Sequence, residues 1–194
     1  MQSVVHTETD VANEALSACK AAPLLSLDAA DTEKARLLRQ HFAPVRDTLQ
    51  RLYVWNFNEA FLSLPEGGGA IPDGFGYSHR FPFTTDMLGV RDVVGCGRRD
   101  WKVQGRSIVA AVSGPLKVVA SVRVPAVEVW DPLFRTTFVA SLAYAIAPRL
   151  STDDELIERL RRAAQDALAQ ATPIDAGEGD PEQPEEQDVI LSRF

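Results

Sequence analysis

The residue types that most often carry chemistry are few in this chain and lie far apart in its sequence. The histidines at positions 6, 41 and 79 lack the i, i+4 spacing of a zinc site, and Cys19 and Cys96 form no CxxC pair. The GxSxG, GxxxxGKS/T and GxGxxG patterns of nucleophilic catalysis and nucleotide binding do not occur. We therefore expect no enzyme: no catalytic residue, no metal and no cofactor. We interpret both cysteines as buried apolar residues.

A small α+β enzyme stays an open alternative, because a catalytic site can be assembled from residues without a local motif. In that alternative the site lies around His79, Arg80 and Asp86. Two other segments have a suggestive composition. Residues 66–76, EGGGAIPDGFG, predict a flexible surface loop, since no Lys-Ser/Thr follows the glycines. Residues 177–188, GEGDPEQPEEQD, lack the EF-hand register, so we expect weak calcium affinity at most.

The clearest periodicity lies in residues 28–55, where apolar side chains recur at alternating spacings of three and four. The residues of this stripe are Ala35, Leu38, Phe42, Val45, Leu49 and Leu52. The pattern predicts a long amphipathic helix that is capped by Asp28 or Asp31 and carries Arg46 and Gln50 on other faces. We expect a shorter helix before it, capped by Thr7 or Thr9.

The hydrophobic period then changes to two. We expect a short amphipathic element from Trp55, and strands between Tyr77 and Val124 that form a small sheet or meander. Two helices follow the strands. The first is predicted to start with Asp131 as its cap and Pro132 at its first position, and the second with a capping box of Ser151 and Asp154.

This order of elements predicts an α+β fold. We expect a bundle of about four helices with a small antiparallel β-sheet inserted between the second and third helices, followed by an extended C-terminal tail. Residues 1–64 and 126–171 are assigned to the bundle, 65–125 to the β-rich insertion and 172–194 to the acidic tail. The chain lacks an N-terminal signal pattern and a membrane-length apolar run, so we expect an intracellularly made protein without membrane contact.

The tail combines acidic residues with an apolar tip. It holds seven Asp and Glu residues against Arg193 alone, and so carries −6 of the net charge of −7. The remaining chain is close to neutral, which argues against tight nucleic-acid binding. The tip consists of Val189, Ile190, Leu191 and Phe194 beside Arg193. A segment this charged does not bury itself, so we expect its apolar tip to dock on a neighbouring protein and to fold there.

Several short motifs follow one another in a characteristic order. They comprise Pro23, Ser26, Leu27 and Asp28; then Val45, Arg46, Asp47 and Leu49; then Trp55, Asn56 and Phe57; then Gly105 and Arg106 in WKVQGRSIVA; and Trp130 and Phe134 in WDPLF. This order resembles the tail tubular protein A family, the head–tail adaptors of short-tailed bacteriophages and related phage-like particles. The likeness extends over nearly the whole chain.

The resemblance implies a structural virion protein made in the host cytoplasm and placed in the neck of the particle. Members form a ring, typically of twelve copies, that joins the portal protein to the tail nozzle and leaves a channel for double-stranded DNA. It also implies that the motif residues serve the core, that the tip docks on the portal or a neighbour, and that residues 65–76 face the channel or the nozzle. A binding module or assembly factor outside the virion is a further alternative.

Overall fold

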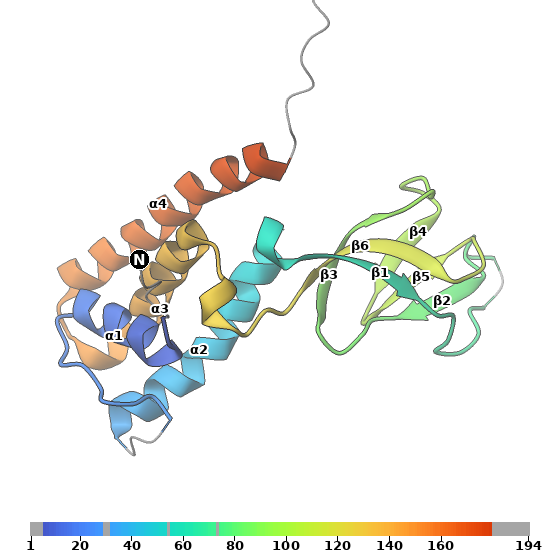
Figure 1. Cartoon of the computed structure of the whole chain (residues 1–194). Helices are drawn as coiled ribbons and strands as arrows, with labels where there is room; N and C mark the ends of the chain where they lie inside the picture. Colours follow the sequence, from blue (N-terminus) through green and yellow to red (C-terminus); the bar gives the residue numbers. More distant parts are fainter. Residues whose placement is uncertain (1–5, 29–31, 54, 73, 180–194) are drawn as a thin grey trace, which may run out of the picture.

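Four helices and six strands follow one another in the predicted order in the computed structural model, which describes residues 6–28, 32–53, 55–72 and 74–179 (Figure 1). The helices are α1 (Glu8–Ala18), α2 (Glu33–Leu52), α3 (Pro132–Leu150) and α4 (Asp154–Gly179). The strands are β1 (Glu59–Leu64), β2 (His79–Pro82), β3 (Met87–Val93), β4 (Trp101–Gln104), β5 (Ser107–Ala110) and β6 (Leu116–Val122). One-turn helices η1 (Asn56–Asn58) and η2 (Val127–Val129) flank the strands. The predicted α+β fold is confirmed.

Local caps start the first and third helices as expected. The Thr7 hydroxyl accepts a hydrogen bond from the backbone N–H of Asp10, whose carboxylate accepts one in return from the Thr7 N–H. This capping box lowers the pKa of Asp10. Asp131 caps α3 by accepting from the N–H groups of Leu133 and Phe134, with Pro132 at the first position.

The predicted caps of the other two helices are wrong. Thr32, rather than Asp28 or Asp31, caps α2 by accepting from the Ala35 N–H. Asp153 accepts from the Leu156 N–H at the start of α4, while the Ser151 hydroxyl accepts from Asp153 and not from the helix. In both cases a neighbouring side chain with an equally suitable oxygen reaches the first turn.

The bundle has a core of apolar side chains from all four helices. Leu38 and Phe42 of α2 meet Phe134, Phe138, Leu142 and Ile146 of α3, and α1 adds Val11, Ala15 and Leu16. Helix α3 is central, because α1, α2 and α4 each pack against it. No helix in the described ranges is both long and apolar enough to cross a membrane.

The strands form two three-stranded antiparallel sheets instead of the single sheet that was expected. The first has the order β1-β6-β3 and the second β2-β5-β4. In the first, Ala60 lies opposite Ala120, and in the second Phe81 lies opposite Ile108. Inward-facing residues of both sheets share a second core, formed by Leu64, Phe81, Met87, Val93, Ile108, Ala110, Leu116, Val118 and Ala120. We call these strands and their loops the β domain.

The two cores give the molecule two lobes, and β1 leads from the bundle into the β domain while β6 returns beside it (Figure 1). Strand β1 begins at Glu59, so the β domain starts within residues assigned to the bundle; the expected amphipathic element at 55–65 is η1 followed by this strand. The expected tail boundary is also wrong, because α4 continues to Gly179 and buries Ala171 and Asp175. The docking residues Val189 to Phe194 lie outside the described residues.

Candidate functional site at the joint between bundle and β domain

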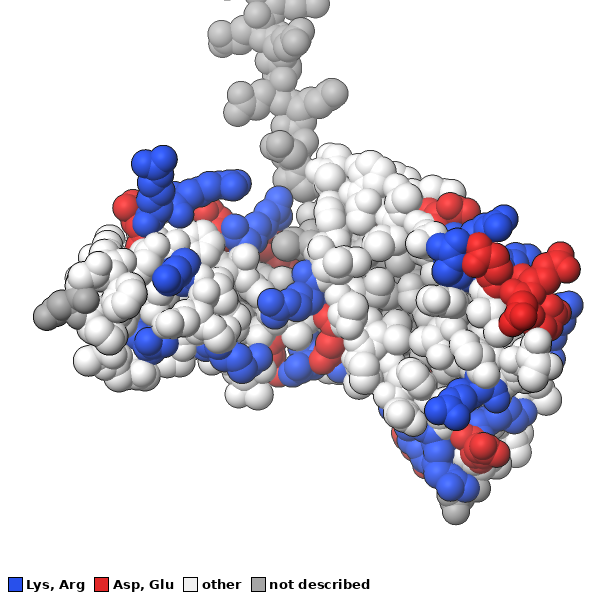
Figure 2. Space-filling view, turned by 180° about the vertical axis from the view of Figure 1, so that it is seen from behind, with Lys and Arg blue, Asp and Glu red and all other residues white. Residues whose placement is uncertain are grey.

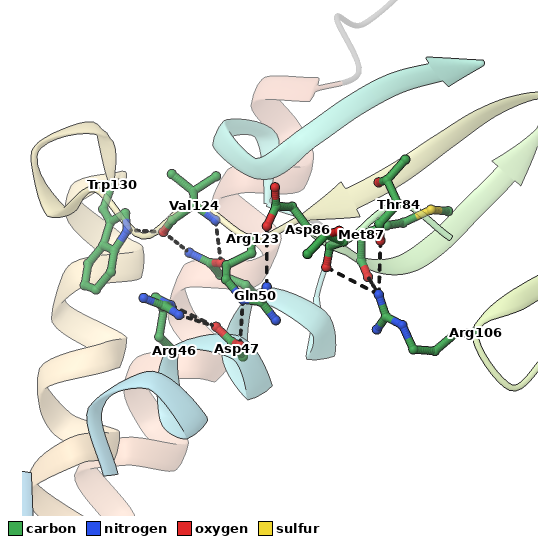
Figure 3. A network of polar contacts seen from close by, with 11 residues as sticks. Arg46, Asp47, Gln50, Thr84, Asp86, Met87, Arg106, Arg123, Val124 and Trp130 are labelled. Atoms are coloured by element: carbon green, nitrogen blue, oxygen red, sulfur yellow. Dashed lines mark hydrogen bonds and ion pairs between the residues drawn. The ribbon is translucent and has the colours of Figure 1, made fainter. Parts of the chain in front are cut away.

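An arginine directly after β6 links the two lobes. Arg123 Nε donates to Asp47 Oδ2 on α2 over 2.8 Å, and its Nη1 lies 3.5 Å from Asp86 Oδ1 in the β domain. The second oxygen of Asp47 accepts from Arg46, whose side chain is only 9% exposed. Figure 3 shows these side chains in one chain of contacts that crosses from α2 to the β domain. We call this region the joint.

The buried side-chain amide of Gln50 holds the chain where it leaves β6 and the β domain. Gln50 is fully buried; its amide nitrogen donates to the Val124 carbonyl over 2.9 Å, and its oxygen accepts from the Val124 N–H over 3.0 Å. The indole of Trp130 donates to the same carbonyl over 2.9 Å. The Gln50 side chain thus replaces the backbone partner that Val124 lost on leaving the sheet.

Another arginine shapes the loop that presents Asp86. Arg106 Nη2 donates to the Thr84 carbonyl over 3.0 Å and lies 3.4 Å from the Met87 carbonyl. Arg106 follows Gly105, whose φ of +59° in the turn between β4 and β5 favours glycine. The glycine therefore permits the turn, and the arginine after it fastens the loop before β3 (Figure 3).

The end of α4 is attached to the same region. Asp175 is 4% exposed, and its carboxylate accepts from the Asn56 N–H at 3.2 Å, while the Asn56 amide donates to the Asp175 carbonyl over 2.6 Å. Burial raises the pKa of Tyr53, and the charge of Asp175 and a hydrogen bond to it add to this effect. Tyr53, η1 and α4 therefore meet where the bundle passes into β1.

Aromatic rings form the apolar side of the joint. Trp55 is fully buried, donates from its indole to the Leu49 carbonyl and packs edge-on against Phe134, with ring centroids 5.1 Å apart. Phe134 also contacts Phe57 and Trp130 at 4.8 and 5.1 Å. Such edge-to-face pairs add geometric preference to the burial of large apolar area. The joint thus has a packed aromatic side and an ion-paired side.

This arrangement holds parts of the chain together. Arg46 and Arg123 pair with Asp47, and Arg106 donates to the Thr84 carbonyl. Among the described residues, no group of three His, Cys, Asp or Glu side chains is placed to hold a metal ion. What the joint does is to set the orientation of the β domain on the bundle.

The residues of the alternative enzyme site have separate partners. His79 Nδ1 lies 2.9 Å from Glu66 Oε1, and Arg80 Nη2 donates to Gln104 Oε1 over 3.0 Å. Asp86 pairs with Arg123. Within the part of the chain that the structure describes, no hydrogen bond or ion pair connects His79 or Arg80 to Asp86.

The remaining candidate residues stay apart. His41 is half-buried in a hollow of about 660 Å³ between α2 and α3, lined also by Glu33, Arg36 and Arg149. Cys19 is buried, its thiol contacts the Ala143 carbonyl at 3.4 Å, and burial raises its pKa to about 11, so it is an unreactive packing residue. Cys96 lies partly buried against the core of the β domain.

The motif residues divide between core and surface. Leu27, Trp55, Trp130 and Phe134 are buried in the bundle, with Val45 and Phe57 partly buried against them. The expectation that all of them serve the core is wrong for Pro23, Asp28, Gly105 and Arg106, which are exposed. Asp28 acts through its backbone, since its carbonyl accepts from Arg39 over 2.8 Å.

Two polar residues of α2 were misplaced by the periodicity. Arg46 and Gln50 were expected away from the packed face, yet they are 7% and 0% exposed. Their i, i+4 spacing places them together on a second buried face, which covers the exit of β6. The spacing was visible in the sequence, but two polar residues four apart are also typical of a solvated face.

Comparison of the chain with protein-family models and with curated proteins gave no match.

Proposed function

We propose that the chain is a head–tail adaptor, a structural virion protein that forms a ring, a dodecamer by the family resemblance, between the portal and the tail nozzle. DNA passes through the channel of this ring without sequence-specific binding. The proposal rests on the resemblance and on one structural observation: motif residues far apart in the sequence converge on a joint that connects two lobes.

The contacts of the joint support a structural role for the chain. Arg46 and Asp47 of one motif, Arg106 of another and Trp130 of a third all lie in it, and each holds a neighbouring segment in place. A ring subunit needs its two lobes at one angle, because every copy must repeat the same contact around the axis.

The surface is compatible with such a role. Figure 2 shows Lys, Arg, Asp and Glu side chains in small mixed clusters, and a broad area of the bundle between them without charges. An uncharged area of this kind suits contact between copies, since no charge has to be desolvated there. The mixed clusters agree with a channel protein that does not grip the phosphate backbone.

The decisive experiment is electron microscopy of negatively stained particles. The purified chain is mixed with rings of the portal protein encoded in the same genome, and portal alone serves as the control. We expect a second ring stacked on the portal. Bare portals in the presence of excess chain contradict the proposal, and an assembly factor outside the virion is distinguished by its absence from finished particles.

The position of the loop at 66–76 is a separate part of the proposal. In the described residues Glu66 faces His79, so the loop starts at the edge of the β domain. If the loop faces the channel, Glu66→Lys adds a cation along the DNA path and slows DNA ejection. Unchanged ejection places the loop away from the channel.

A further inference from the structure

Helix α4 ends beside the β domain. Asp175 is hydrogen-bonded to Asn56, and Gly179 lies four residues further, about 6 Å along the helix axis. Three residues after Asn56, the carboxylate of Glu59 at the start of β1 pairs with Arg91 of β3 over 2.5 Å. The end of α4 is therefore attached three residues from the partner of Arg91.

Basic side chains gather on the adjoining part of the β domain. The exposed members are Arg91, Arg98, Arg99 and Lys102, and we call them the basic surface. In Figure 2, Lys and Arg side chains line the upper edge of this domain. Two members, Arg91 and Arg98, line a hollow of about 610 Å³ together with Asp92 and Trp101.

The basic surface has an excess of positive charge. Arg91 pairs with Glu59 over 2.5 Å, and Lys102 lies 5.1 Å from the centre of the Tyr77 ring. Arg98 and Arg99, by contrast, make no ion pair among the described residues. The indole N–H of Trp101 is buried and donates to no acceptor in the described part of the chain. Glu59, Asp92 and Asp100 lie among these four cations, so the surface keeps an excess of one positive charge.

The segment that follows α4 has the opposite character. Residues 180–188, DPEQPEEQD, contain five carboxylates, no cation and two prolines. Proline favours extended backbone, and nine residues at about 3.1 Å each span about 28 Å. This reach suffices to follow the basic surface from the end of α4. Because the segment is tethered beside that surface, its effective concentration there is in the millimolar range.

We propose that residues 180–188 lie on the basic surface of the β domain of the same chain, with their carboxylates against Arg98 and Arg99 and across the hollow lined by Trp101. Docking on the same chain is favoured over docking on a second copy, because the tether replaces a bimolecular encounter. This inference does not depend on the adaptor function.

Cross-linking in the full chain tests the proposal. Glu185→Cys is combined with Asp92→Cys at the hollow in a Cys96→Ser background, while native Cys19 stays buried. The matched control replaces Asp92→Cys by Asp166→Cys, which removes the same charge at an exposed position on α4. With a short bismaleimide at low salt, we expect monomeric cross-linked product to form at least about threefold faster for the hollow pair.

The electrostatic origin is checked separately. The double variant Arg98→Glu, Arg99→Glu is expected to remove the difference in cross-linking rate between the two cysteine pairs. The same loss is expected in 1 M NaCl, because salt screens exposed ion pairs. Arg159→Glu with Arg162→Glu, the same charge change at the other end of α4, leaves it intact. Replacing the acidic residues at 180, 182, 186 and 188 by their amides also removes it, and these changes leave the described residues untouched.

Three results overturn the proposal: equal rates for the two cysteine pairs, a difference that persists in 1 M NaCl, or product that is exclusively intermolecular. Attachment to portal rings is measured on the same variants. Because the cross-link reports on the isolated chain and the stacking of rings on the assembly, failure of one is distinguishable from failure of the other.

Discussion

The carboxylate of Asp175 accepts hydrogen bonds from the backbone N–H of Asn56, 119 positions earlier, with both oxygens 3.2 Å from the nitrogen. This contact fastens the last turns of α4 to η1, where the chain enters the β domain. An acidic residue that the composition assigns to the tail is thus a structural residue of the bundle.

Removing the Asp175 carboxylate leaves the Asn56 N–H without that acceptor. We expect Asp175→Ala to lower the free energy of unfolding by about 1–3 kcal/mol, measured by urea denaturation. Hydrogen exchange of residues 172–179 speeds up in the same variant. The matched change Asp166→Ala, at an exposed position of the same helix, stays within about 0.5 kcal/mol. Equal effects of the two variants refute the anchoring role.

The pair of Asp47 and Arg123 is accessible to a double-mutant cycle. Their side chains are 28% and 30% exposed and 2.8 Å apart. Asp47→Ala, Arg123→Ala and the double variant are predicted to give a coupling energy of about 1 kcal/mol in urea denaturation. The exposed pair of Glu158 and Arg162 serves as the reference, for which we expect a smaller value. A coupling energy of zero means that the ion pair of Asp47 and Arg123 does not stabilise the folded state.

Lys20 has a φ of +56°, which is the left-handed region where side chains with a Cβ are strained. It ends α1, with its N–H donating to the Ser17 carbonyl over 2.9 Å. Relief of strain exceeds the added entropy of the unfolded chain, so Lys20→Gly raises thermal and urea stability by about 0.5 kcal/mol. Ala18→Gly, two residues earlier within the helix, lowers it by about 1 kcal/mol. If Lys20→Gly lowers the stability, the strained left-handed conformation assigned to Lys20 at the end of α1 is contradicted.

The carboxylate of Glu158 makes the stability of the folded chain depend on pH in the acidic range. Hydrogen bonds from Arg161 and Arg162 lower its pKa from 4.5 to about 2. Because the pKa in the folded state lies below that in the unfolded state, the stabilisation is complete above pH 4.5 and is lost as the pH falls towards 2. Urea denaturation of Glu158→Gln is therefore expected to lose this part of the pH dependence. Glu155→Gln retains it, and equal pH profiles of Glu158→Gln and the native chain contradict the assignment.

Deletion of residues 188–194 tests the docking of the apolar tip. Both apolar cores are built from residues before this segment, so the truncated chain is expected to stay folded and monomeric, with the native circular dichroism spectrum and melting temperature. If each docked apolar side chain contributes about 1.5–3 kcal/mol before ordering costs, its loss abolishes attachment to portal rings. Attachment equal to that of the native chain contradicts the docking role.

Local signals in the sequence determined the class of fold. The starts of α1 and α3 at Thr7, Asp131 and Pro132 were predictable, because a cap needs only backbone groups within one turn. The change of hydrophobic period from three and four to two likewise reports which elements form, since it follows from their geometry alone. The acidic composition of residues 180–188 is also plain in the sequence, and it limits what that segment is able to bury.

Tertiary structure decided which polar residues are buried. Gln50 and Asp175 have the sequence environment of surface residues, and only the arrival of Val124 and Asn56 from distant positions supplies their partners. The division of the strands into two sheets around a second core was decided in the same way. Burial of a polar group depends on compensation by a partner, and a partner far away in the chain leaves no local pattern.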